Sequence, residues 1–171
     1  PEPIISEPRR QENIEHQIEN TSYYRPNSNL DSVLSRDKKL VSFVGTTKNG
    51  TSFIVNNLGV LFSSMGINTA ILDTTQNRNS YYIFTKNEES LRKIAYDSIP
   101  KLAQGRSEGI QVNKNLTVYT ALPGDENPAF NIQEALNTLA NTYSLVLIDC
   151  DFYTPIEYFA SSQEIYLIQS M

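Results

Sequence analysis

The residues best suited to chemistry in this sequence lie in one short loop, Gly45-Thr46-Thr47-Lys48-Asn49-Gly50-Thr51-Ser52. The two glycines and the final hydroxyl residue have the spacing of a phosphate-binding loop, in which backbone N–H groups surround the phosphates and the hydroxyl binds Mg²⁺. Such a loop normally has lysine immediately before the hydroxyl residue, where this sequence has Thr51. The pattern therefore indicates a nucleotide site that lacks its usual cation.

Two interpretations of this loop remain open from the residues. Two unit charges about 4 Å apart interact by about 4 kcal/mol at an effective dielectric constant of about 20, so the absent lysine weakens triphosphate binding unless Lys48 replaces it. Alternatively, Lys48-Asn49-Gly50 is an ordinary turn, and Thr51 or Ser52 caps the helix that follows. The loop alone favours neither interpretation.

Two aspartates end apolar stretches, Asp73 after Thr69-Ala-Ile-Leu and Asp149 after Ser144-Leu-Val-Leu-Ile. Each would stand at the carboxyl end of a predicted sheet strand beside the loop, and with Ser52 they would form a Mg²⁺ site. The alternative is that both are strand-end caps or turn residues. Cys150 is interpreted as a small buried residue, because no candidate base accompanies it in the sequence. With one cysteine and one histidine, the chain excludes an internal disulfide and a Cys/His metal cluster.

The elements that must position these residues alternate between strands and helices. A strand is expected at 40–44, and Ile54, Leu58, Leu61 and Met65 recur at helical spacing before Gly66, a suitable helix stop. Further strands are expected at 69–73, 115–122, 144–149 and 164–170, with helices at 88–105 and 131–143. This order predicts an α/β fold with a mostly parallel sheet and helices on both faces. Because the last strand reaches the end of the sequence, we expect the domain to be truncated at its C-terminus.

Composition sets the domain count and the partners that charge would favour. Among 171 residues, 39% are hydrophobic, which is enough for one domain at 39–171 after a polar, proline-containing linker at 1–38. The net charge of −5 gives no strong case for binding nucleic acid or an anionic membrane. No apolar run approaches the roughly 20 residues that span a bilayer. A cytoplasmic location is expected.

From Lys39 onward the sequence resembles the ParA/MinD superfamily of P-loop ATPases, which includes bacterial tyrosine kinases and the CpaE/TadZ pilus-assembly proteins. The resemblance rests on the loop, on Asn57-Leu58-Gly59, on Gly66 before the strand that ends in Asp73, and on the apolar strand that ends in Asp149. The tyrosine-kinase branch is disfavoured because the ten tyrosines are dispersed and none lies at the C-terminus. The CpaE/TadZ branch suits the proline-containing linker.

Three departures from the family pattern decide the expected activity. Thr46 and Thr51 stand where family members have lysines, and Thr75 replaces the acid that positions the hydrolytic water. The resemblance then implies weak binding of ATP or ADP with magnesium, little or no hydrolysis, a homodimer, and protein partners in a larger assembly. We expect a localisation, assembly or regulatory protein, with pilus or secretion machinery as one candidate and recruitment to a membrane-associated machine. The alternatives are an active ATPase that uses Lys48 and a scaffold that binds no nucleotide.

Overall fold

The computed structural model describes residues 39–46, 48–124, 131–158 and 162–167. The predicted linker at 1–38, Thr47 in the loop and the last predicted strand residues beyond 167 lie outside these ranges. The strands of the sheet are β1 (Leu40–Gly45), β2 (Thr69–Asp73), β3 (Ile110–Asn113), β4 (Leu116–Tyr119), β5 (Leu145–Cys150) and β6 (Gln163–Leu167). The helices are α2 (Thr51–Ser64), α3 (Asn79–Thr85), α4 (Glu89–Leu102), α5 (Ile132–Thr142) and the short 3-10 helix η1 (Ile156–Tyr158).

The strands form one sheet in the order β3-β4-β2-β5-β1-β6. All neighbouring pairs are parallel except β3 and β4, which are antiparallel. Asp149 on β5 pairs in register with Asp73 on β2 and with Phe43 on β1. The carboxyl ends of β1, β2 and β5 therefore meet at one edge of the sheet, which is where ligands bind in open α/β sheets.

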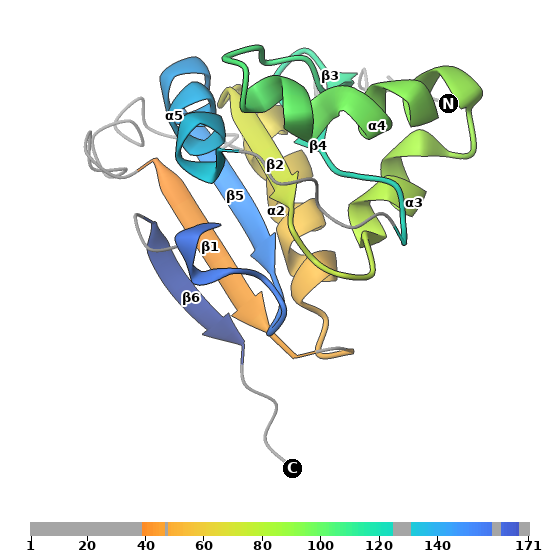
Figure 1. Ribbon diagram of the computed structural model, residues 1–171. Helices are drawn as coiled ribbons and strands as arrows, with labels where there is room; N and C mark the ends of the chain where they lie inside the picture. Colours follow the sequence, from red (N-terminus) through yellow and green to blue (C-terminus); the bar gives the residue numbers. More distant parts are fainter. Residues whose placement is uncertain (1–38, 47, 125–130, 159–161, 168–171) are drawn as a thin grey trace, which may run out of the picture.

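Helices cover both faces of the sheet, as predicted. In Figure 1, α5 and η1 lie in front of the sheet and α2 lies behind β2 and β5. Alternate residues of β5 serve the two faces: Leu145 and Leu147 pack with Val55 of α2, whereas Val146 and Ile148 pack on the α5 side. This alternation is the period of two that a strand buried on both faces requires. The predicted α/β class with a mostly parallel sheet is confirmed.

Two glycines have structural roles in helix α2, one just beyond its end and one in its middle. Gly66 adopts φ 87° just beyond the helix, and the N–H groups of Gly66 and Ile67 donate to the carbonyls of Ser63 and Phe62. This is a Schellman ending, in which the left-handed residue is normally glycine. Inside the helix, a Cβ at Gly59 would lie 2.5 Å from Cδ1 of Ile71. A larger residue at that position would therefore force the Ile71 side chain to shift.

Some elements differ from the sequence-based expectations. Helix α3 and strand β3 were not predicted, and the helix expected at 88–105 is α4 at Glu89–Leu102. The strand expected at 115–122 is shorter, at Leu116–Tyr119, while the last strand begins at Gln163. In the described part of the chain, no helix has the length and apolar character needed to cross a membrane.

Candidate functional site

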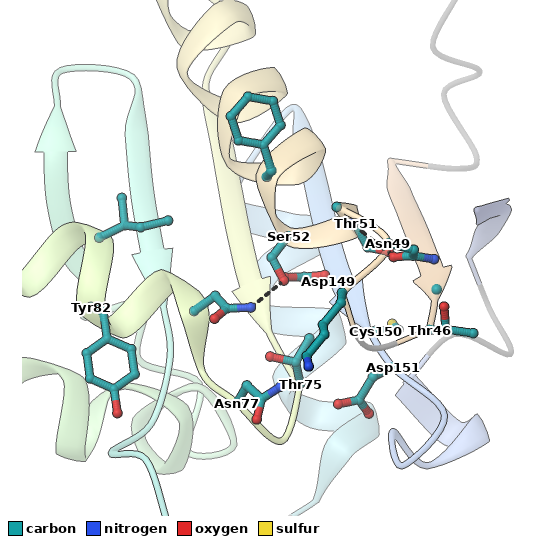
Figure 2. Close-up of a pocket in the computed structure, with 16 residues that line it drawn as sticks. Thr46, Asn49, Thr51, Ser52, Thr75, Asn77, Tyr82, Asp149, Cys150 and Asp151 are labelled. Carbon is teal, nitrogen blue, oxygen red and sulfur yellow. Dashed lines mark hydrogen bonds between the residues drawn. The ribbon is translucent and has the colours of Figure 1, made fainter. Parts of the chain in front are cut away.

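A pocket of about 450 Å³ lies at the edge of the sheet where β1, β2 and β5 end. We call it the loop pocket. Its walls come from the glycine-containing loop and first turn of α2, from the β2–α3 connection and α3, and from the end of β5 (Figure 2). The lining residues are Gly45, Thr46, Lys48, Asn49, Gly50, Thr51, Ser52, Phe53, Thr75, Asn77, Asn79, Tyr82, Ile83, Asp149, Cys150 and Asp151.

The structure brings most of the predicted site residues to this pocket. Every described residue of the predicted loop lines it, from Gly45 and Thr46 to Ser52, and Asp149 joins them from β5. Thr47 lies outside the described residues. Asp73 does not line the pocket and has no exposed surface. The predicted trio of Mg²⁺ ligands is therefore divided, with Ser52 and Asp149 at the pocket and Asp73 beneath it.

Asp73 instead organises the turn that follows β2. Among the described residues, its carboxylate accepts hydrogen bonds from the Thr75 N–H at 3.0 Å, the Thr75 hydroxyl at 2.7 Å, the Ser80 N–H at 2.9 Å and the Thr120 hydroxyl at 3.4 Å. Burial raises the pKa of Asp73, against the lowering effect of the Thr75 hydroxyl and the Arg78 charge. The alternative interpretation of Asp73 as a turn residue thus describes its contacts.

Ser52 lies in the first turn of α2, directly before the pocket. Its hydroxyl accepts a hydrogen bond from Nδ2 of Asn79, the first residue of α3, at 3.1 Å (Figure 2, dashed line). The backbone N–H groups of Ser52 and Phe53 lie in the first helical turn and have no acceptor within the helix. A hydroxyl, two N–H donors and the positive end of the helix dipole therefore converge at this point, which is a suitable arrangement for an anion.

Asp149 has an environment that is costly for a carboxylate. The residue has no exposed surface, and neither carboxylate oxygen has a hydrogen-bond partner among the described residues. Burial raises the pKa of Asp149 to about 8, with further raising by the negative charges of Asp73 and Asp151; the nearby Ser52 hydroxyl lowers it without completing a hydrogen bond. Buried polar groups in proteins are normally satisfied, so an unpartnered pair of oxygens facing a pocket indicates a missing partner.

The Asp151 side chain is held at the pocket by hydrogen bonds from two backbone N–H groups. Asp151 accepts from the Gln76 N–H at 2.7 Å and from the Tyr153 N–H at 2.9 Å, so it ties the segment after β2 to the segment after β5.

Lys48 is exposed, adopts φ 69°, and is the only lysine or arginine among the described lining residues. Any positive side-chain charge that this part of the chain supplies to the pocket therefore comes from Lys48.

Cys150 is buried, in agreement with its interpretation as a packing residue. Burial raises the pKa of its thiol to about 12, and the Thr74 hydroxyl lies 3.7 Å from the sulfur. Because the thiolate is the nucleophilic form, this thiol is inert near neutral pH.

Across the described residues, no group of three or more His, Cys, Asp or Glu side chains is placed to hold a metal ion by itself. A cation at this site would need ligand oxygens or water in addition to Ser52 and Asp149.

Sequence reasoning missed the α3 side of the pocket. Tyr82 and Ile83 on α3 and Phe53 on α2 line it while remaining 60%, 48% and 70% exposed, respectively. Figure 2 shows Tyr82 on the α3 side, opposite Thr46 and Asn49. The cluster Tyr81-Tyr82-Ile83-Phe84 was the available signal, but its aromatic and β-branched residues are equally typical of a strand. The pocket thus combines a polar loop with exposed apolar side chains from α2 and α3.

Comparisons with known proteins support the fold. A crystal structure of the chimeric protein CapA2B2 matches with a TM-score of 0.54 and 21% identity, over 81% of this chain and 66% of that one. The BceF tyrosine kinase domain matches with a TM-score of 0.45 and 20% identity, over 70% of this chain and 50% of that one. The chain thus spans about two thirds of the first protein and half of the second. No protein-family model and no curated protein matches. The likeness to CapA2B2 shows a P-loop-type fold.

Proposed function

We propose that this chain is a ParA/MinD-like P-loop domain that binds ADP or ATP with Mg²⁺ weakly and hydrolyses it little or not at all. It acts by interaction, as a localisation, assembly or regulatory component of a larger machine. The observation that carries the nucleotide part of this proposal is the buried, unpartnered carboxylate of Asp149 beside Ser52 in the loop pocket. The ParA/MinD part rests on the sequence resemblance.

The residues present fit a magnesium ion that is shared with phosphates. Mg²⁺ prefers oxygen ligands, keeps several waters, and is commonly bound by one or two carboxylates together with substrate phosphates. Asp149 offers two oxygens without partners, and Ser52 offers a hydroxyl at the start of α2. When bound, the cation would supply positive charge to the phosphates. Ser52 and Asp149 would hold it, and the first-turn N–H groups of α2 would bind the anion.

Weak or absent hydrolysis follows from the side chains that replace the usual ones. Phosphoryl transfer depends on cations that stabilise charge and on a group that positions the attacking nucleophile. At the usual lysine position, the Thr51 side chain is neutral, and its hydroxyl donates to Asn49. Thr75 has a hydroxyl where the family has a carboxylate, and that hydroxyl donates to Asp73. The side chain therefore has no carboxylate with which to position water in the pocket. Binding without turnover is the activity that these residues support.

Thermal unfolding tests the proposal. Magnesium with ADP should raise the melting temperature of the parent protein, because a ligand at about 100 times its Kd adds about 2.7 kcal/mol to the free energy of unfolding. We expect the increase to be lost when EDTA removes the metal, and to be lost in Asp149→Asn. A matched control is Asp97→Asn on α4, a residue that is about half-exposed and outside the pocket. No increase in the parent protein would instead favour a scaffold that binds no nucleotide.

The active-ATPase alternative is favoured by one observation, the position of Lys48 in the pocket wall. Phosphate release from Mg-ATP separates it from the proposal. Turnover well above background that disappears in Lys48→Ala would establish hydrolysis through an altered loop. We expect no turnover in the parent protein.

We also propose that the chain works as a homodimer and within a larger protein assembly. The support is the family resemblance together with a group of exposed aromatic residues near the pocket, among them Phe53, Phe152 and Tyr153. Exposed apolar patches on a folded protein commonly mark interaction surfaces.

A further inference from the structure

The side chain of Asn49 lies inside the glycine-containing loop and forms contacts at both of its ends. Its Oδ1 accepts from the backbone N–H of Thr51 at 3.2 Å and from the Thr51 hydroxyl. Its Nδ2 donates to the backbone carbonyl of Leu167 at 2.8 Å. These partners define the orientation of the amide, because an N–H only donates and a carbonyl only accepts. Asn49 therefore links the start of α2 to the end of β6.

The space occupied by this side chain is the interior of the loop. A Cβ at Gly45 would lie 1.9 Å from Oγ1 of Thr51, and 2.5 and 2.8 Å from Nδ2 and Oδ1 of Asn49. The loop backbone thus curls around the Asn49 amide and the Thr51 hydroxyl, which together fill the space above Gly45. Any other residue at position 45 would therefore require the Thr51 and Asn49 side chains to move out of the loop.

The Asn49 side chain accepts a hydrogen bond from a backbone N–H group that a bound phosphate would need. The first N–H groups of a helix have no acceptor within the helix, so a phosphate at this end would receive their hydrogen bonds. Here the amide oxygen of Asn49 already accepts from the Thr51 N–H. An entering phosphate must displace that oxygen or bind with one donor fewer, and displacement also requires the bond to Leu167 to break or to reorganise.

We propose that Asn49 is an internal competitor for the anion site. Its amide oxygen accepts the Thr51 N–H hydrogen bond that a phosphate oxygen would otherwise accept. Its amide nitrogen donates to Leu167, so this arrangement of the loop is linked to the end of β6. The residue therefore sets the affinity of the loop pocket for phosphate-bearing ligands, and movement of β6 would change that affinity. The inference rests on the proposed function, since it assumes that the pocket takes a phosphate. A second observation that points to a ligand at this pocket is the buried Asp149 carboxylate, whose oxygens have no hydrogen-bond partner among the described residues.

Calorimetric titration of the whole chain with inorganic pyrophosphate and Mg²⁺, at fixed ionic strength, tests this inference. In Asn49→Ala the competing oxygen is absent, and we expect at least tenfold tighter binding than in the parent protein. In Asn49→Asp the acceptor remains and gains a negative charge, so we expect weaker binding than in the parent protein. Asn137→Ala, an exposed asparagine on α5, is the matched control and should leave the affinity unchanged.

The same samples give a structural readout that does not depend on ligand. The Thr51 amide should exchange with solvent faster in Asn49→Ala than in the parent protein, because it loses its acceptor. If Asn49→Ala does not fold, Asn49→Gly carries the same expectations, since glycine likewise has no side-chain acceptor for the Thr51 N–H and no donor for the Leu167 carbonyl.

The outcomes separate this inference from the proposed function. Equal pyrophosphate affinity in the parent protein and Asn49→Ala overturns the inference, and the proposed function stands if both proteins bind Mg-ADP. Tighter pyrophosphate binding in Asn49→Ala supports the inference, and the proposed function fails if neither protein then binds Mg-ADP. Absence of pyrophosphate binding in every variant overturns the inference, and absence of Mg-ADP binding as well overturns the proposed function.

Discussion

At the scale of single residues, the buried carboxyl group of Asp149 lowers the stability of the fold and is also suited to bind a cation. A carboxylate that is buried without hydrogen bonds destabilises the native state, and its pKa is raised from an ordinary 3.8 to about 8 for that reason. Native proteins retain such groups mainly where a ligand or a reaction needs them. The same carboxyl group would bind a cation well because nothing else in the described structure occupies its oxygens.

This cost predicts a dependence of stability on pH. Between about pH 4 and pH 8 the native protein holds a proton on Asp149 that the unfolded chain has released. The free energy of unfolding therefore falls as pH rises through this range, by up to about 1.4 kcal/mol per pH unit. In Asp149→Asn that loss is absent, so the variant should gain stability over the parent protein and gain most near pH 8. Urea unfolding midpoints of both proteins at pH 5 and pH 8, without metal, measure this.

Two results would contradict the expectation for Asp149. One is a parent protein whose midpoint does not fall between pH 5 and pH 8, and the other is an equal fall in Asp149→Asn. A smaller slope that remains in the variant belongs to other groups, including Asp73, whose pKa is also raised by burial.

The candidate site shows which residues a sequence can place and which it cannot. The spacing of the loop residues predicted the position of Ser52, and the end of an apolar strand predicted the position of Asp149. Both predictions depend only on residues that are close together in the sequence. The position of Asp73 at a strand end was also correct, but its role depends on Thr75, Ser80 and Thr120, which satisfy its carboxylate in the folded turn. The contact from Asn49 to Leu167 joins residues 118 positions apart, and no local pattern could indicate it.

At the scale of elements, alternation of apolar runs and helical periodicity was sufficient for the central strands and for α2, α4 and α5. Helix α3 was missed because Asn79-Ser-Tyr-Tyr-Ile-Phe-Thr favours a strand by propensity, and the residue before it, Arg78, provides no side-chain cap. Tertiary packing decides the matter, since Tyr81 is buried in the core on the α2 face of the sheet. Strand β3 was missed because only Ile110 of its four residues is buried.

The close approach of α2 to β2 at Gly59 can be tested by substitution. Gly59→Ala should lower the free energy of unfolding by about 1–2 kcal/mol, because the added methyl group overlaps Cδ1 of Ile71 in a tightly packed layer. That net loss combines an overlap cost of about 2–3 kcal/mol with the gain of about 1 kcal/mol that alanine gives to a helix. Ile71→Val removes Cδ1, so in that background Gly59→Ala should cost less or become stabilising. Urea unfolding of the four proteins of this double-mutant cycle gives the coupling, and strictly additive effects would contradict the overlap.

At the scale of the whole molecule, several exposed aromatic residues line the loop pocket or directly follow a residue that lines it. Phe152 and Tyr153 are 76% and 72% exposed immediately after Asp151, which lines the pocket, and Phe53 is exposed in the pocket wall itself. Interface centres are enriched in aromatic residues, and exposed apolar patches often mark such surfaces. This distribution supports the proposal that a partner binds on the same side of the molecule as the candidate site.

The proposed homodimer should therefore form across the pocket side. Sedimentation velocity over a range of concentrations should show a monomer–dimer equilibrium that Mg-ADP shifts toward dimer, since a ligand bound between two copies stabilises their association. Tyr153→Ser should weaken dimerisation at least tenfold, because it removes a large exposed aromatic group beside the pocket. Tyr96→Ser on α4 is the matched control: Tyr96 is 60% exposed but does not line the pocket, and its loss should have no effect. A protein that stays monomeric with and without Mg-ADP, or equal effects of the two variants, would contradict a dimer formed through this surface.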